Sequence, residues 1–205
     1  MNKTKSKRGE TLIEVLISVT SLILISTAAS MTIMASIKGT QLSKEYLVAQ
    51  NLSAEAKEII NNIRDTNWLM CPTKKEECWN IADSQGSSDC NCSGKAKIED
   101  GSNYYTIQGN NKEWHLEKET PILDLENSPE LATSYALCRE VLEDNVYNYI
   151  SCLQDGTDLD NAAFYRSITV TGESESSLNI GIKIQWYSGT QINTLHTSAL
   201  ISNSL

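Results

Sequence analysis

Six cysteines are the residues of this sequence best able to bind a metal or to form covalent links. Cys71, Cys78, Cys90 and Cys92 are separated by six, eleven and one residues, a spacing without the Cys-x2-Cys pairs typical of zinc sites. Disulfides are therefore the favoured interpretation, and no metal is expected. Cys90 and Cys92 are too close to bridge each other easily, so each is expected to bond a more distant cysteine. The remaining two, Cys138 and Cys152, are expected to pair.

Catalytic signatures are scarce elsewhere in the chain. Its two histidines, His115 and His196, stand beside strand-like apolar residues without a nucleophile motif, so core or surface positions are expected for both. No Gly-x-Ser-x-Gly, phosphate-loop or His-Glu-x-x-His pattern occurs. The sequence therefore predicts that the protein is not an enzyme and needs no cofactor.

One carboxylate is in an unusual place. Glu14 is the only charged residue between positions 12 and 37, in the run LIEVLISVTSLILISTAASMTIMASI. A carboxylate that enters an apolar membrane zone costs about 2.5–3.5 kcal/mol, so it is expected to have a partner. The alternative is that Glu14 lies near enough to the membrane interface to be hydrated.

The element that carries Glu14 is long enough to span a bilayer. The uncharged run from Val15 has 23 residues, which at ~1.5 Å per residue covers ~35 Å. It is too long for a simple cleaved signal peptide. The four cations ahead of it, Lys3, Lys5, Lys7 and Arg8, predict a cytoplasmic N-terminus. The cysteines, all downstream, are then exported, in agreement with their expected disulfides.

The charge of the chain argues against nucleic-acid binding. The net charge is −9, and loss of the four leader cations would make it −13 (−9 minus 4). Nucleic-acid binding usually rests on a basic patch, and the sequence has none outside the leader. We therefore expect no direct nucleic-acid partner.

Residues 7–16, KRGETLIEVL, closely resemble the processing site of type IV prepilins and pseudopilins. The resemblance implies that prepilin peptidase cleaves after Gly9 and leaves a mature chain that starts at Glu10, with Glu14 as its fifth residue. It further implies that Glu14 pairs with the α-amino group of Glu10 on a neighbouring subunit during assembly. The expected partners are prepilin peptidase, other pilin subunits, the pilus assembly platform and the membrane.

Two features depart from the usual family pattern. Glu10 occupies the position where most members have Phe, which bears on the N-methylation that usually follows cleavage. A proline often found in the membrane helix is also absent. At the other end of the helix, residues 62–68, NIRDTNW, look like the helix end of type IV pilus modification proteins, the V-type minor pilins.

Apolar residues continue the helix beyond the membrane. Leu42, Ala49, Leu52, Ala56, Ile59 and Ile63 recur at helical spacing. Pro72 and the following cysteine turn predict that the helix ends near Trp68. Packing of this stripe on the head is favoured, and coiled-coil dimerisation is the alternative. The predicted organisation is a leader at 1–9, a transmembrane helix at 10–38, an amphipathic helix at 39–68 and a cysteine-containing head at 69–205.

The head is predicted to be an antiparallel sheet, which makes the fold α+β and pilin-like. Strands are expected at residues 104–108, 113–117, 146–153, 164–172, 178–187 and 194–201, as neighbours in a meander. Residues 72–100 are expected to form a cysteine-pinned loop, and residues 130–142 a short helix, with a strand over residues 141–149 as the alternative at its end. The tyrosines at 104, 105, 147 and 149 are expected to pack in the sheet, with an adhesive surface as the alternative.

Together these features predict a minor type IV pilin that acts by assembly. Its helix is expected to be held in the cytoplasmic membrane until the subunit enters a pilus at the cell surface. A pseudopilin of a type II secretion or DNA-uptake system is the alternative within the family. A single-pass anchored binding domain or enzyme is the alternative from another class.

Overall fold

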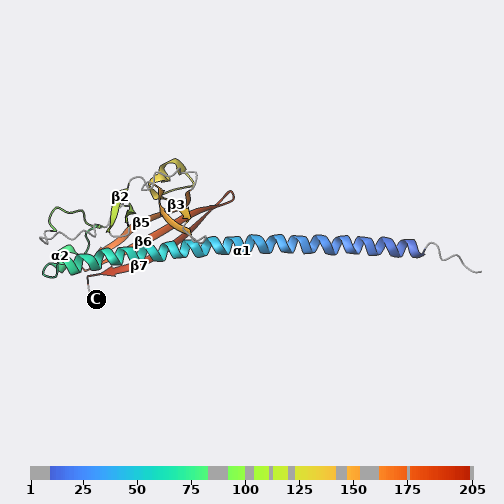
Figure 1. The fold of residues 1–205 in the computed structure, drawn as a ribbon, viewed down its shortest axis with the longest axis horizontal. Helices are drawn as coiled ribbons and strands as arrows, with labels where there is room; N and C mark the ends of the chain where they lie inside the picture. Colours follow the sequence, from blue (N-terminus) through green and yellow to red (C-terminus); the bar gives the residue numbers. More distant parts are fainter. Residues whose placement is uncertain are drawn as a thin grey trace, which may run out of the picture. The chain divides into compact units, whose positions relative to one another are not determined.

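A computed structural model describes residues 10–82, 92–99, 104–110, 113–119, 123–141, 147–152, 162–174 and 176–203 (Figure 1). The chain divides into two units, Met1–Glu45 and Tyr46–Leu205. One helix, α1 (Glu10–Met70), starts in the first unit and ends in the second. All strands that the structure describes belong to the second unit, which we call the head. The predicted α+β class is confirmed.

Helix α1 ends close to the predicted position. It stops at Met70, two residues after Trp68, and the Cys71 amide still donates a hydrogen bond to the Asn67 carbonyl. Pro72 then disfavours a helical conformation at the residue before it. The helix end therefore follows from a local steric rule.

The predicted apolar stripe of α1 forms its contact with the sheet. Its buried members are Ala49, Leu52, Ala56, Ile59 and Ile63, and Ile60 adds to them. Leu42 is the exception, because its side chain is 44% exposed. Leu42 precedes the part of α1 that belongs to the head, so helical spacing alone assigned it wrongly to this stripe.

Seven antiparallel strands form one sheet. They are β1 (Tyr104–Asn110), β2 (Glu113–Glu119), β3 (Ala136–Val141), β4 (Tyr147–Ser151), β5 (Ala162–Ser174), β6 (Ser177–Ser188) and β7 (Gln191–Ser202). β5 is the central strand, with β6 along one side and both β1 and β3 along the other. β2 pairs with β1, β4 with β3, and β7 with β6. The predicted meander therefore holds only for β5, β6 and β7.

β6 shows most clearly why the sheet covers the helix. Its buried apolar residues alternate along the strand: Leu178, Ile180, Ile182, Ile184 and Trp186. Successive strand residues face opposite sides of a sheet, so all five side chains lie on one side. Together with the α1 stripe they form the main core cluster.

The opposite side of the sheet has a smaller cover. Leu123, Leu125, Ala132 and Tyr135 form a separate buried cluster against Tyr104, Tyr165 and Ile192. Lys183 on β6 donates a hydrogen bond of 2.8 Å from Nζ to the Leu123 carbonyl. Burial lowers the pKa of Lys183, and nearby Asp124 partly opposes that shift. Burial under the same cover raises the pKa of the Tyr135 phenol.

The short helix predicted at residues 130–142 is wrong for its second half. A 3-10 helix, η1, spans Pro129–Tyr135, and the chain then enters β3 at Ala136. β3 pairs with β4 and β5. Residues 136–141 therefore lie between two neighbouring strands. This pairing outweighs the helical spacing of their apolar residues, because tertiary contacts override local propensity.

The cysteine-pinned loop contains more structure than predicted. A single-turn helix, α2 (Lys75–Cys78), follows α1, and an isolated bridge joins Ile81 to Lys97. Part of the predicted loop, residues 83–91 and 100, lies outside the described residues. Among the four tyrosines, Tyr105 is buried and Tyr149 packs edge-on against Phe164, which agrees with sheet packing. The side chain of Tyr147 lies outside the described residues.

Candidate functional site

The first unit exposes an apolar helix surface. α1 contains an 18-residue window of mean hydropathy 2.1, none of it buried, and is long and apolar enough to cross a membrane. Its large apolar side chains between Leu12 and Ile37 are 49–72% exposed. A soluble monomer seldom leaves so continuous an apolar surface in water. This segment therefore requires a lipid or protein environment.

Most hydroxyl side chains of this helix segment donate hydrogen bonds within the helix itself. Hydroxyl groups donate to carbonyl oxygens three or four residues earlier, as in Ser18 to Glu14 at 2.8 Å, Ser21 to Ile17 at 2.7 Å and Thr32 to Ala28 at 3.0 Å. The same arrangement holds for Thr20, Ser26, Thr27 and Ser30. An unsatisfied hydroxyl is costly in a hydrocarbon environment. These internal bonds make the helix compatible with lipid despite its serines and threonines.

Glu14 lies on this exposed surface, one helical turn after Glu10. Its side chain is exposed, and both residues belong to α1. Residues four apart lie on the same face of a helix, at a rise of ~6 Å. Gly9 and the Glu10 side chain lie outside the described residues.

The cysteines confirm two of the disulfide expectations. Cys138 pairs with Cys152, at a Cα separation of 5.0 Å, and joins β3 to the residue after β4. Cys92 pairs with Cys78, at a Cα separation of 5.5 Å, so it does bond a distant cysteine. Cys90 lies outside the described residues.

A third buried sulfur lies beside the first disulfide. The sulfur atoms of Cys71, Cys78 and Cys92 all lie within 4.8 Å of one another. Two of the three are joined in the disulfide, and a disulfide sulfur is not the thiolate that binds a metal. The disulfide thus links α2 to the following loop, and the Cys71 sulfur after α1 lies beside it.

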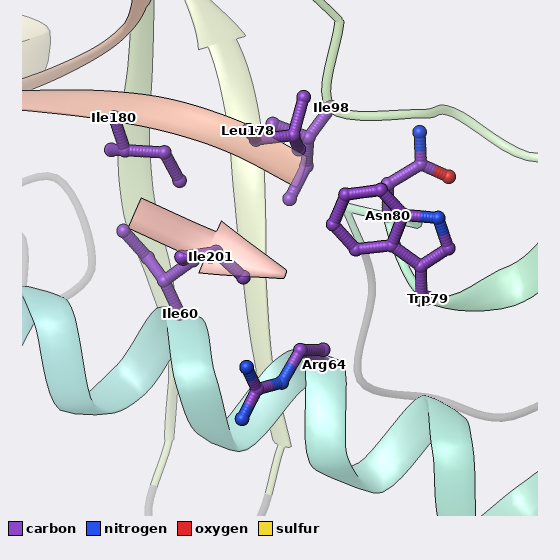
Figure 2. A pocket seen from close by; sticks show the side chains of 8 residues that line it. All are labelled: Ile60, Arg64, Trp79, Asn80, Ile98, Leu178, Ile180 and Ile201. Atoms are coloured by element: carbon purple, nitrogen blue, oxygen red, sulfur yellow. The ribbon is translucent and has the colours of Figure 1, made fainter. Parts of the chain in front are cut away.

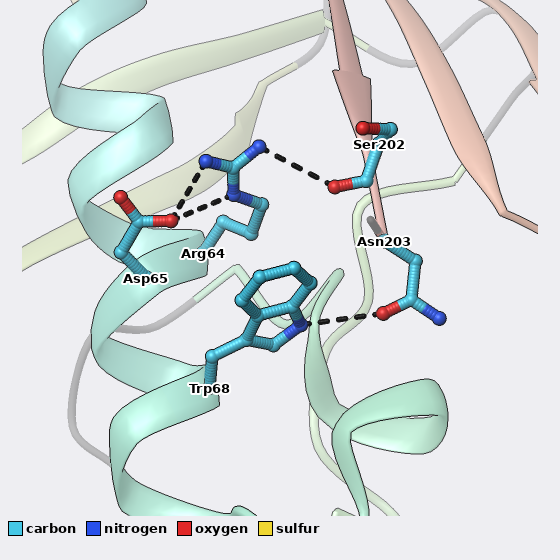
Figure 3. A network of polar contacts seen from close by, with 5 residues as sticks. All are labelled: Arg64, Asp65, Trp68, Ser202 and Asn203. Atoms are coloured by element: carbon cyan, nitrogen blue, oxygen red, sulfur yellow. Dashed lines mark hydrogen bonds and ion pairs between the residues drawn. The ribbon is translucent and has the colours of Figure 1, made fainter. Parts of the chain in front are cut away.

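The helix end singled out in the sequence forms a network with the end of β7 (Figure 3). Arg64 lies 2.7 Å from the Asp65 carboxylate and donates to the Ser202 carbonyl at 3.3 Å. The Trp68 indole donates to Asn203 at 3.2 Å. The Arg64 guanidinium also lies 5.4 Å from the centre of the Trp68 ring, a separation typical of a cation–π contact. Residues 62–68 therefore attach α1 to the C-terminal strand.

The network extends to the loop after α1. Asn67 is buried, and its amide donates to the Ile81 carbonyl at 3.2 Å. Lys75 lies 5.4 Å from the Trp68 ring centre. In the sequence, this segment stands out only by its resemblance to the helix end of the V-type minor pilins. The signal that could have assigned its role is the concentration of side-chain donors directly before a helix end, where chain segments must be fastened.

A buried arginine also joins α1 to the sheet, and sequence analysis missed it. Arg166 on β5 lies 3.5 Å from the Glu55 carboxylate and donates to the Leu52 carbonyl at 3.3 Å. Burial lowers the pKa of Arg166, and Glu55 partly opposes that shift. An arginine nevertheless keeps its proton in proteins. A buried cation with two partners on the helix fixes how the helix and sheet fit together.

Two crevices lie between elements of the described part of the head. A crevice between α1, the loop after α2 and the ends of β6 and β7 encloses about 210 Å³, part of it open to solvent (Figure 2). Its lining is mainly aliphatic: Ile60, Arg64, Trp79, Asn80, Ile98, Leu178, Ile180 and Ile201. A second crevice, beside Tyr135 and Arg166, measures about 190 Å³.

Neither histidine lines either of these two crevices. His115 on β2 and His196 on β7 are both exposed, and they lie on different strands at opposite ends of the pairing order.

Comparison with protein-family models, curated proteins and solved structures found no match. The candidate site is therefore the N-terminal part of α1, supported by a head whose charged and polar contacts fasten its own elements together.

Proposed function

We propose that this chain is a minor type IV pilin, a subunit that prepilin peptidase processes after Gly9 and that enters a pilus through its N-terminal helix. The observation that carries the proposal is the run KRGETLIEVL, residues 7–16, directly ahead of an exposed apolar helix. Cleavage at this place would remove the leader and keep the helix on the product. The protein would remain attached to the membrane until it assembles.

The head supports this proposal in two ways. Its two disulfides suit an exported domain, since disulfides persist outside the reducing cytosol. Its core incorporates residues 49–63 of the same helix that carries Glu14. The head and the assembly segment are thus parts of one continuous element, as a subunit that is placed by its helix requires. In the membrane the N-terminus would be cytoplasmic and the head outside.

The proposal is tested by where the full-length protein is found. In the native host, the chain should appear in the filament fraction that shearing releases from the cell surface, at a small fraction of the amount of the main subunit. A strain without prepilin peptidase should retain it in the membrane at the uncleaved mass. Recovery only from membranes in both strains would contradict a role as a pilus subunit. Recovery there together with a secretion or DNA-uptake defect would instead favour a pseudopilin.

A further inference from the structure

The C-terminal strand forms a long, regular edge of the sheet. β7 spans Gln191–Ser202, and its twelve residues pair with β6 in an unbroken register. Among the strands that the structure describes, β6 is its only neighbour. Within the described part of the chain, the other side of β7 is therefore an edge of the sheet.

The register shows which backbone groups point away from β6. A two-residue turn, with Gly189 at φ 64°, joins Ser188 to Gln191, and such a turn closes on a hydrogen-bonded pair. Pairs then alternate along an antiparallel ladder. The outward N–H and C=O groups belong to Ile192, Thr194, His196, Ser198 and Leu200. No hydrogen bond to these backbone groups comes from any residue that the structure describes.

The end of the strand confirms this alternation. Ser202, the next outward residue, has its carbonyl bonded to Arg64, while the inward Asn203 amide donates to Ser176 beyond the start of β6. Arg64 thus already provides a hydrogen-bond donor for the outward carbonyl of Ser202. The five outward residues before Ser202, from Ile192 to Leu200, direct their backbone N–H and C=O groups away from β6.

β7 also lacks the features that usually protect an edge strand. Edges are commonly blocked by lysine or other charges, proline, bulges or short length. β7 has no Asp, Glu, Lys, Arg or Pro and no register shift. β2, an end strand on the other flank, carries Glu113, Glu117, Lys118 and Glu119 in seven residues. β4, the other end strand, is also uncharged but has only five residues, so β7 is the long uncharged end of the described sheet.

The direction of β7 bears on what can occupy this edge. The Ser53 hydroxyl contacts the Thr197 hydroxyl, and Arg64 contacts Ser202, so β7 runs in the same direction as the head part of α1. Antiparallel pairing of β7 with β7 of a second copy would reverse one α1 relative to the other. Two subunits anchored in the same membrane cannot be reversed in this way, so such a dimer does not suit the edge.

We propose that β7 receives an extended, uncharged strand from a different pilin-like subunit, which continues the sheet through the outward groups of residues 192–200. This inference rests on the proposed function, because the direction argument requires membrane-anchored subunits. Neutral side chains on β7 match a neutral partner strand, whereas the acidic remainder of the head would repel another acidic surface. Main-chain hydrogen bonds would give the contact its strength.

The experiment compares three variants of the full-length protein in the native host. Ser198→Pro removes one outward N–H and blocks close approach, yet leaves the bonds to β6 intact, since proline is tolerated at strand edges. Leu200→Lys adds a charge at a side chain that is 69% exposed. Ser198→Ala keeps the N–H and is the matched control. We expect about a tenfold fall in filament incorporation for the first two and none for the control.

A photocrosslinking amino acid at Ser198 identifies the occupant. The inference predicts a crosslink, in filaments, to a strand of another processed pilin-like subunit, and loss of that crosslink with Leu200→Lys. A crosslink to a second copy of this chain, or unchanged incorporation of both edge variants, would overturn it. In either case, normal cleavage after Gly9 and recovery in filaments would leave the proposed function standing, whereas failure of cleavage would refute that function itself.

Discussion

Replacing Glu14 with alanine is expected to abolish incorporation into filaments while cleavage and membrane insertion stay normal. In the proposed assembly, the carboxylate pairs with the α-amino group of Glu10 on a neighbour within the bilayer. Removal of one member of a desolvated pair costs about 3–5 kcal/mol, which corresponds to a more than ~100-fold fall in the equilibrium for docking. The measurement is the amount of variant in sheared filaments relative to the amount of processed protein in membranes.

Two further variants make this result specific. Glu14→Gln keeps the size of the side chain but removes its charge, so it should fail almost as fully as alanine. Ser21→Ala removes a hydroxyl that bonds only to the Ile17 carbonyl of its own helix, so it should assemble normally. Normal assembly of Glu14→Ala would show that the carboxylate has no role in docking and is simply hydrated near the interface.

Replacing Trp186 with alanine is expected to cause the largest loss of stability in the head. Its side chain is 1% exposed and lies between Tyr46 of α1, at 5.4 Å between ring centres, and Phe164 of β5, at 5.8 Å. Loss of a buried tryptophan costs about 3–5 kcal/mol, because the surroundings fill the cavity only in part. At about 2 kcal/mol per molar urea, the midpoint should fall by ~2 M.

The neighbouring tyrosine supplies the control. Tyr187 is 43% exposed on the opposite side of β6, so Tyr187→Ala should shift the midpoint by a small fraction of that amount. Pulse proteolysis of the full-length protein in detergent measures both variants without relying on tryptophan fluorescence. Equal shifts for the two variants would contradict the assignment of this side of β6 to the core between helix and sheet.

Features that depend on local pattern could be predicted from the sequence. The end of α1 followed from Pro72, and the packing face from the spacing of residues 49–63. The alternation from Ile180 to Trp186 placed β6 correctly. The Cys138–Cys152 disulfide was also predicted. Each of these signals resides in residues close together along the chain, where periodicity and backbone sterics act directly.

Features that depend on distant partners were missed. β3 was assigned in part to a helix because Leu131, Tyr135 and Cys138 stand at helical spacing, and only pairing with β5 decides otherwise. The contact of Arg166 with Glu55 joins residues 111 positions apart (166 minus 55), so no spacing rule could reveal it. The order of β1 and β3 along β5 is non-local for the same reason.

For the candidate site, the sequence supplied more than the fold did. Gly9, Glu10 and Glu14 are recognisable as a spacing in residues 7–16. The structure adds the environment of that segment: an exposed apolar helix with internally bonded hydroxyls, continuous with the core of a disulfide-bonded head. A docking helix must combine these properties, since it has to enter lipid and also carry a folded domain.

The most direct test of the account is the N-terminus of the mature protein. Mass spectrometry of the chain purified from its native host should find Glu10 as the first residue. The same chain from an otherwise identical strain without prepilin peptidase should retain residues 1–9. A native, filament-associated chain that still begins with the leader would contradict processing at Gly9 and, with it, the proposed function.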